Sequence, residues 1–303
     1  MASLADNLDR LAAALGPLEG EPAPLEGGIT NRNYRARFGG REVVVRLPGK
    51  DTELLDIDRA AEAAANRCAA RAGVAPGVAA LLDDPPCLVT DFVEGEAMSP
   101  EELRAPAALA EVAALLRTIH ACGETLPSSF SALGIAAAYA ERARSRGGEV
   151  PAAYGPAHEA AARIERALGA EPPVPSHNDL LAANFLRSAE GIRLVDWEYA
   201  GMGSRWFDLG NFAVNNELGA AEEEALLAAY FEEPPSAGRL AALRLMRFMS
   251  DFREAMWGVL QATISDLDFD FDEYAGRHFE RLRESAADPG FETALKEASD
   301  GTE

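Results

Sequence analysis

The residues best suited to chemistry in this 303-residue chain stand in one stretch, 176–186, which reads Ser-His-Asn-Asp-Leu-Leu-Ala-Ala-Asn-Phe-Leu. Asp179 and Asn184 are five positions apart there, and Asp196 follows at the end of an apolar run that predicts a strand. Carboxylate and amide oxygens are the ligands that Mg²⁺ prefers, and a carboxylate can accept a proton from a reacting hydroxyl. The pattern therefore predicts a phosphoryl-transfer site, with Asp179 as base and with Asn184 and Asp196 as metal ligands. The structural alternative is that all three are turn or strand-end residues.

The same residues resemble those of the choline/ethanolamine kinase and aminoglycoside phosphotransferase superfamily, whose members are relatives of the protein kinases. Residues 177–179 (His-Asn-Asp) resemble its catalytic loop, and residues 196–199 (Asp-Trp-Glu-Tyr) resemble the segment that replaces Asp-Phe-Gly. The likeness continues through 207–211, and residues 253–258 (Arg-Glu-Ala-Met-Trp-Gly) are especially like the choline/ethanolamine kinase branch. It covers most of residues 25–283. The resemblance implies an ATP- and Mg²⁺-dependent small-molecule kinase.

The resemblance also implies an ATP site in the first third of the chain. Residues 27–31 (Gly-Gly-Ile-Thr-Asn) resemble a phosphate-covering loop, and Arg46 stands in a valine-rich strand where kinases hold a lysine. The two lysines, Lys50 and Lys296, lie outside that strand, so the cation for the phosphates is Arg46, whose planar fork suits phosphate oxygens. Glu62 is its expected ion-pair partner, and the backbone of residues 90–93 would meet adenine. The implied ATP-binding residues are Gly28, Thr30, Asn31, Arg46, Glu62, Asp91 and Val93.

An acceptor of the choline type carries a cation, and cations are bound by aromatic faces, often with a carboxylate nearby. Trp257, in an expected helix 245–264, is the main aromatic candidate, although a tryptophan in a helix is also a common core residue. The predicted acceptor-binding residues are Glu198, Tyr199, Glu254 and Trp257. We expect His177 and Asp208 to support the backbone of the catalytic loop and to take no part in proton transfer.

Other functions remain open from the sequence alone. The same scaffold could serve thiamine, an aminoglycoside or another small alcohol, because the acceptor pocket decides the substrate. A nucleotide-binding pseudokinase is a second alternative, and the intact Asp179, Asn184 and Asp196 argue against it. A protein or lipid kinase is disfavoured, since the sequence has no Gly-x-Gly-x-x-Gly loop and no Ala-Pro-Glu segment.

Positioning these residues requires two lobes, and the element pattern predicts them. A β-rich opening with one helix precedes a long helical region, which indicates an α+β, protein-kinase-like fold. We expect a small N-terminal nucleotide-binding lobe over 1–93, a larger catalytic lobe over 94–284, a hinge near 91–96 and a flexible tail over 285–303. The expected elements are a short helix within 1–16, strands 33–38, 42–47, 87–93 and 191–197, and helices 56–72, 100–122 and 136–146.

Composition narrows the partners. A formal net charge of −22 argues against nucleic acid and anionic membranes, which select basic surfaces, and it suits a cationic small acceptor. Three widely spaced cysteines predict a reducing compartment, and the first residues lack the pattern of a signal peptide, so we expect a cytoplasmic protein. The sequence does not indicate an oligomeric state.

Overall fold

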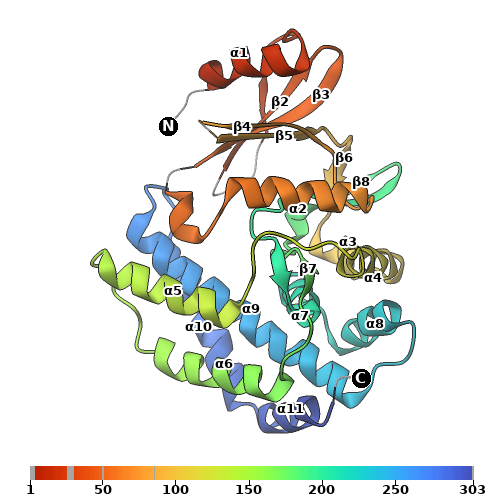
Figure 1. Cartoon of the computed structure of the whole chain (residues 1–303). Coiled ribbons are helices and arrows are strands. Elements are labelled where there is room, and N and C mark those ends of the chain that lie inside the picture. Colours follow the sequence, from red (N-terminus) through yellow and green to blue (C-terminus); the bar gives the residue numbers. More distant parts are fainter. Residues whose placement is uncertain (1–3, 26–30, 50, 85, 302–303) are drawn as a thin grey trace.

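The computed structural model describes residues 4–25, 31–49, 51–84 and 86–301, and it has a β-rich N-terminal lobe above a larger helical lobe (Figure 1). This arrangement confirms the predicted α+β fold class with two lobes. Gly28 and Thr30, two of the predicted ATP-binding residues, lie outside the described residues. Among the described helices, none is both long and apolar enough to cross a membrane.

The N-terminal lobe is built on an antiparallel five-stranded sheet in the order β1-β2-β3-β5-β4. Its central hairpin turns at Gly39 and Gly40, whose φ angles of 54° and 82° suit the left-handed conformation that a two-residue turn needs. Alternate valines of β3, Val43 and Val45, are fully buried, as the period of a strand requires. The strands are β1 (Ala23–Leu25), β2 (Asn31–Phe38), β3 (Arg41–Pro48), β4 (Val78–Asp83) and β5 (Pro86–Asp91).

Two helices flank this sheet, with α1 (Leu4–Leu15) above it and α2 (Arg59–Arg71) beneath it, next to the second lobe (Figure 1). The helix expected from residue 56 begins at Arg59, because Asp58 caps it by accepting hydrogen bonds from two backbone N–H groups. A short 3₁₀ turn, η1 (Thr52–Leu55), precedes it. The cap fixes the start of α2, and the first turn of this helix carries Glu62.

The larger lobe surrounds one long helix, α9 (Ala237–Ile264), which packs against α5, α7, α10 and α11. The helix expected over 100–122 is two helices, because Pro106 starts a new one at its first position. The remaining helices of this lobe are α3 (Pro100–Arg104), α4 (Pro106–His120), α5 (Ala132–Ser145), α6 (Tyr154–Leu168), α7 (Arg205–Asn215), α8 (Ala220–Phe231), α10 (Phe271–Ala287) and α11 (Gly290–Ser299).

Short strands at the top of this lobe hold the loops that carry the candidate catalytic residues. They form a three-stranded sheet, β6-β8-β9, and a two-stranded pair, β7-β10. The expected strand over 191–197 ends at Leu194, so Asp196 lies just beyond it. The strands are β6 (Gly95–Ala97), β7 (Val174–Ser176), β8 (Phe185–Ser188), β9 (Gly191–Leu194) and β10 (Gly201–Gly203), and a 3₁₀ turn, η2 (Ala182–Asn184), precedes β8.

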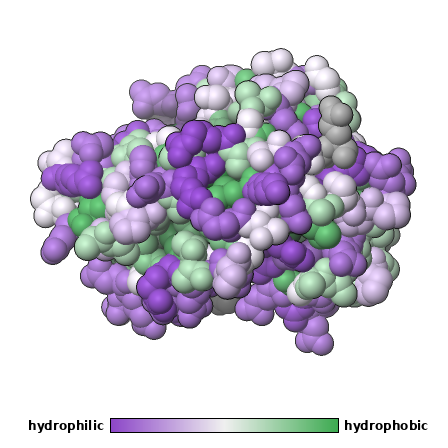
Figure 2. All heavy atoms as spheres, turned by 90° about the horizontal axis from the view of Figure 1, so that it is seen from below, coloured by the Kyte–Doolittle hydropathy of each residue, from purple (hydrophilic) through white to green (hydrophobic). Residues whose placement is uncertain are grey.

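The expected flexible tail over 285–303 is corrected by the structure. Residues 285–287 complete α10, and α11 packs on α9 and α6 through the buried Phe291, Leu295 and Ala298. This segment is mostly polar, but it has three apolar residues at helical spacing, which are enough to anchor one short helix. The lower face of the molecule, which includes this end, is a mosaic in which hydrophilic residues predominate (Figure 2).

Candidate active site

The loop between β7 and η2 carries the candidate base, and a buried carboxylate holds its backbone. Asp208 of α7 is fully buried and accepts hydrogen bonds from the backbone N–H of His177 at 2.9 Å and of Asn178 at 2.7 Å. These bonds are the support that the sequence predicted for Asp208. His120, which sequence reasoning missed, donates from Nε2 to the same carboxylate at 2.9 Å, and its Nδ1 lies 2.7 Å from Tyr230 Oη. The loop therefore rests on a buried network that reaches α4 and α8.

His177 ties the same loop to the strand that leads to Asp196. Its Nδ1 accepts from the Asp179 N–H at 3.2 Å, which makes Nε2 the protonated nitrogen that donates to Val195 O at 3.0 Å. Burial lowers the pKa of His177 to about 4, so the ring is neutral near pH 7. A neutral ring with both nitrogens occupied positions the backbone, in the structural role expected for it.

Asp179 is a buried carboxylate whose pKa is raised. Burial raises the pKa of Asp179 to about 7; the positive charge of Arg253 opposes this, and the negative charges of Glu254, Asp196 and Glu198 add to it. Arg253 Nη2 lies 3.4 Å from Asp179 Oδ1 and donates to Asn178 O at 2.9 Å, so it also orients the loop. A carboxylate with a pKa near the working pH can both accept and release a proton.

The two candidate metal ligands lie on adjoining segments below Arg46. Asn184 uses its amide nitrogen to donate to Asp179 O at 2.8 Å, and its backbone O accepts from Val195 N at 3.0 Å. Asp196 has a left-handed backbone, with φ of 68°, and Asn178 shares that angle. Such non-glycine conformations cost about 1–3 kcal/mol each and cluster at functional sites.

The donor set fits a magnesium ion that is shared with a nucleotide. Within the described part of the chain, no group of three or more His, Cys, Asp or Glu residues could hold a metal by itself. Mg²⁺ is commonly bound by one or two protein oxygens together with substrate phosphates and water. The Oδ1 atom of Asn184 and the carboxylate of Asp196 are hard ligands of this kind. The Asn184 nitrogen is already engaged with the Asp179 backbone, so Oδ1 is the atom that this side chain could offer to a metal.

Arg46 and Glu62 form the expected ion pair on the other side of the lobe boundary. Arg46 Nη1 lies 2.8 Å from Glu62 Oε1 and 2.5 Å from Asp196 Oδ1, so one guanidinium links β3, α2 and the segment after β9. Burial lowers the pKa of Arg46, but the charges of Asp196, Glu62 and Glu198 outweigh it and raise the pKa above its ordinary value. The cation therefore stays charged, with further N–H groups to offer a phosphate.

Asn31 and Glu198 meet a residue that sequence reasoning missed, Arg59. Arg59 donates to Glu62 at 2.7 Å, to Glu198 at 3.1 Å and to Asn31 Oδ1 at 2.9 Å, while Asn31 Nδ2 donates to Glu198 at 2.8 Å. Glu198 thus contacts residues of the N-terminal lobe, whereas it was predicted to bind the acceptor. The available signal was Arg59 three positions before Glu62, a spacing that places both on one helix face.

Beyond Arg253, which contacts Asp179, aromatic residues gather around Trp257. Trp257 Nε1 donates to Tyr199 Oη at 3.2 Å. The rings of Phe271 and Tyr274 make edge-type contacts with Trp257, with centroid distances of 5.7 and 5.6 Å. Tyr274 was missed by the sequence reasoning. Trp257 is 7% exposed, so it is buried among these neighbours.

The carboxylate of this aromatic cluster is Glu254. It pairs with Arg253 and accepts from Tyr274 Oη at 2.8 Å, and Arg253 itself lies 4.6 Å from the ring centre of Tyr199. Of the four predicted acceptor residues, the structure brings Tyr199, Glu254 and Trp257 together. This cluster supplies aromatic rings and one anion near Asp179.

At the expected hinge, the backbone N–H groups of Asp91 and Val93 differ in their hydrogen bonding. The Asp91 N–H donates to Gly77 O at 2.8 Å, and its carboxylate pairs with Arg41 at 2.5 Å. Among the described residues, no backbone group accepts from the Val93 N–H. The backbone of Val93 is therefore the better placed of the two for a hydrogen bond to a base.

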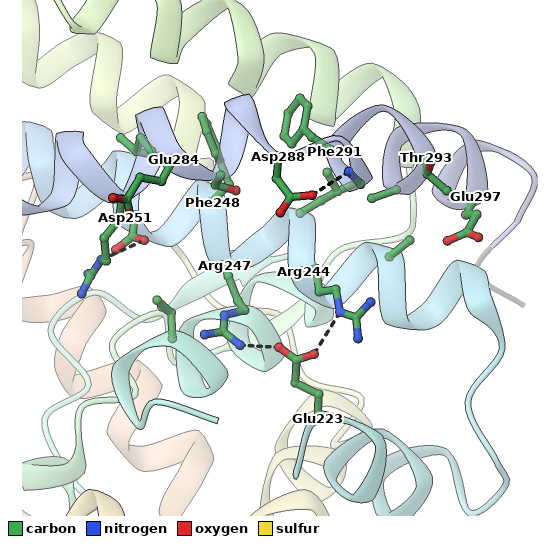
Figure 3. A pocket seen from close by; sticks show the side chains of 18 residues that line it. Glu223, Arg244, Arg247, Phe248, Asp251, Glu284, Asp288, Phe291, Thr293 and Glu297 are labelled. Carbon is green, nitrogen blue, oxygen red and sulfur yellow. Dashed lines mark hydrogen bonds and ion pairs between the residues drawn. The ribbon is translucent and has the colours of Figure 1, made fainter. Parts of the chain in front are cut away.

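A separate groove of about 820 Å³ is lined mainly by residues of α9, α10 and α11 (Figure 3). Its buried carboxylates are neutralised locally: Glu223 pairs with Arg244 and Arg247, and Asp251 with Arg281. None of the candidate catalytic or acceptor residues lines it. The groove is therefore not the place where the predicted chemistry would occur.

Comparisons with known proteins agree with this geometry. Residues 21–243 match the model of the "Phosphotransferase enzyme family". Ethanolamine kinase 2 of Rattus norvegicus is 30% identical over 260 residues, which are 77% of this chain and 67% of the relative.

Solved structures extend the likeness to the whole chain. A choline/ethanolamine kinase family protein from Mesorhizobium loti is 30% identical, with a TM-score of 0.82 over 98% of this chain and 99% of its own. Choline kinase LicA from Streptococcus pneumoniae, at 22% identity, shares the fold with a TM-score of 0.78 over 94% of this chain and 99% of its own. These likenesses confirm the protein-kinase-like fold class.

Proposed function

Because the chain belongs to the phosphotransferase enzyme family, and acts as a phosphotransferase with an alcohol group as acceptor, we propose that it moves the γ-phosphate of ATP, with Mg²⁺, onto the hydroxyl of ethanolamine, choline or a similar amino alcohol. The observation that carries this proposal is that Asp179 contacts residues of two unlike groups. Its backbone O accepts a hydrogen bond from Asn184, one of the candidate metal ligands, and Arg253, 3.4 Å from its carboxylate, pairs with Glu254 of the aromatic cluster around Trp257.

The residues have distinct tasks in the proposed reaction. Arg46 and the backbone near Val93 bind ATP, and Asn184 and Asp196 hold Mg²⁺, which when bound offsets the charge that builds up on the phosphates. Asp179 orients the acceptor hydroxyl and takes its proton as the oxygen bonds to the γ-phosphorus and the bond from that phosphorus to the ADP leaving group breaks. Arg253 and His177 keep the base in place, so little reorganisation is needed at the moment of transfer.

The acceptor class rests on the chemistry of the aromatic cluster. Tyr199 and Tyr274 contact Trp257, so three aromatic rings lie together, and Glu254, which pairs with Arg253, adds a carboxylate beside them. An ammonium group is attracted by both features, and a neutral alcohol by neither. Relatives named ethanolamine kinase, from rat to human, support the same class.

An ATP-consumption screen tests this function. Purified protein with Mg²⁺ and ATP would be offered ethanolamine, choline, thiamine and several aminoglycosides, and the phosphorylated product would be identified by mass spectrometry. Turnover on an amino alcohol alone is the expected result. Turnover only on thiamine or an aminoglycoside would replace the acceptor, and ATP binding without turnover on any acceptor would favour a pseudokinase.

Two Asp→Asn variants, one at the proposed base and one as its matched control, complete the test. Asp179→Asn removes the proposed base with almost no change in shape, and Asp83→Asn makes the same change at an exposed strand end in the N-terminal lobe. Activity that survives in Asp179→Asn would come from a contaminating kinase or from another base.

A further inference from the structure

Arg59, the first residue of α2, joins three separate segments at the boundary between the lobes. Its Nη1 donates to Glu62 Oε2 at 2.7 Å within α2 and to Glu198 Oε2 at 3.1 Å in the lower lobe. Its Nη2 donates to Asn31 Oδ1 at 2.9 Å, at the start of β2. Asn31 closes the ring by donating to the same Glu198 oxygen at 2.8 Å. One guanidinium therefore fixes β2, α2 and the segment after β9 relative to one another.

Arg59 and its two carboxylate partners, Glu62 and Glu198, are buried. Its side chain is 13% exposed, against 0% for Glu62 and 3% for Glu198. Glu62 divides its two oxygens, giving Oε1 to Arg46 and Oε2 to Arg59. Carboxylates this deeply buried need a cation, because their hydration is lost. Arg59 thus neutralises the side of Glu62 that Arg46 does not reach, and Glu198 as well.

This sharing matters for Arg46, the proposed phosphate ligand. Arg46 feels the negative charges of Asp196, Glu62 and Glu198. Without the guanidinium of Arg59, Glu62 and Glu198 would each lose one cationic partner, and they would hold Arg46 more firmly. A phosphate group would then compete less well for Arg46.

We propose that Arg59 is a positioning residue for the nucleotide: by holding Glu62, Glu198 and Asn31, it leaves Arg46 available to the ATP phosphates and fixes the two lobes at the distance that ATP requires. The inference rests on the proposed kinase function and adds a residue to it. Arg59 need not touch the nucleotide. Its effect reaches the phosphates through Arg46 and through the placement of β2 against the segment that carries Asp196.

The role calls for arginine in particular. Arg59 reaches three acceptors with two nitrogens of one planar fork, whereas a lysine presents one compact ammonium group. Arg59→Lys keeps the charge and most of the side-chain volume but cannot span all three segments. It separates the positioning function from the simple presence of a cation.

The test compares Arg59→Lys with Arg71→Lys on the same helix. Arg71 is 58% exposed and pairs with Glu124 at the surface, so its replacement is the matched control. Affinity for Mg²⁺-ADP would be measured by isothermal titration calorimetry, the melting temperature by calorimetry, and the KM values for ATP and for the acceptor by steady-state kinetics. For Arg59→Lys we expect the Kd for Mg²⁺-ADP and the KM for ATP to rise on the order of tenfold, with the acceptor KM changed by less than about twofold.

A second variant guards against a folding defect. Asn31→Ala removes one arm of the ring and leaves every buried charge paired, so we expect a smaller loss of nucleotide affinity. In the double variant the two losses should not add, since both break one network.

The outcomes separate this inference from the proposed function. Wild-type affinity in Arg59→Lys, additive losses in the double variant, or equal losses for ATP and acceptor would overturn the positioning role. Wild-type protein that binds no Mg²⁺-ADP would overturn the kinase function and this inference with it.

Discussion

The two sides of Asp179 are built by different physical means. On the nucleotide side, five charged residues from both lobes are interlocked: Arg46, Arg59, Glu62, Asp196 and Glu198. On the acceptor side, aromatic rings from α9, α10 and the segment after β9 pack around one carboxylate within a single lobe. The first side depends on how the lobes sit together, and the second on the rigid contact between two long helices.

This difference indicates which interactions would supply the binding energy for each substrate. Ion pairs across a lobe boundary can exchange partners when phosphates and Mg²⁺ arrive, because each guanidinium has several donors. A packed aromatic cluster cannot rearrange so freely, and it selects by shape and by the charge of its ligand. Variants on the two sides should therefore affect ATP and acceptor separately, and variants of Asp179 should affect the chemistry itself.

The largest effect is expected for Asp179→Asn. Because the amide cannot accept the hydroxyl proton, kcat should fall by about 10²–10⁴-fold while the Kd for Mg²⁺-ADP stays within about threefold of wild type. Rapid-quench measurement of single turnovers, beside calorimetric binding, distinguishes the two quantities. A loss of binding equal to the loss of rate would mean that Asp179 organises the site and does not act as base.

Next comes Arg46→Met, which removes the cation and keeps most of the volume. Glu62 and Asp196 would lose a buried partner, and loss of one partner of a buried pair costs about 3–5 kcal/mol. We expect kcat/KM for ATP to fall by about a hundredfold or more, with a smaller change in acceptor KM. Equal effects on both substrates would remove the distinction between the two sides. Arg41→Met, an exposed partner of Asp91 on the same strand, is the control.

The residues that the sequence predicted for the nucleotide side are chemically rare and regularly spaced. Asp179, Asn184 and Asp196 follow a spacing that few other tasks require, and Arg46 was the one cation in the expected strand 42–47. The partner Arg59 escaped notice because arginines near glutamates are common on helix surfaces. Only the fold shows that this helix face is buried against Glu198.

The acceptor side was harder to derive, since its members come from distant parts of the chain. Trp257 and Glu254 share α9, but Tyr274 reaches them from α10, and nothing in its neighbourhood sets it apart from a core tyrosine. The expected flexible tail was wrong for a related reason. Burial of α11 depends on a groove between α6 and α9 that no local pattern reveals.

A pH profile sharpens the role of Asp179 between the two sides. Burial raises the pKa of Asp179 to about 7, with Glu254 among the charges that add to the shift. The base must be ionised to accept a proton, so kcat should fall about tenfold for each pH unit below about 7 and level off above it. Glu254→Gln removes a negative neighbour, which should lower the pKa and move the profile toward lower pH. An unmoved profile would mean that another group controls the rate.

The smallest effect is expected for Trp257→Leu on the acceptor side. Loss of a cation–π contact is worth about 0.5–2 kcal/mol, which corresponds to an acceptor KM raised by roughly 2–30-fold with the KM for ATP unchanged. Trp206→Leu is the matched control, because Trp206 is also buried but packs against Phe231 of α8 and not against the aromatic cluster. If both variants lose stability alike and neither changes acceptor KM, Trp257 is a core residue. If Trp257→Leu weakens ethanolamine and a neutral alcohol equally, the cluster selects by shape alone, and the contrast between an electrostatic nucleotide side and a cation-selective acceptor side would fail.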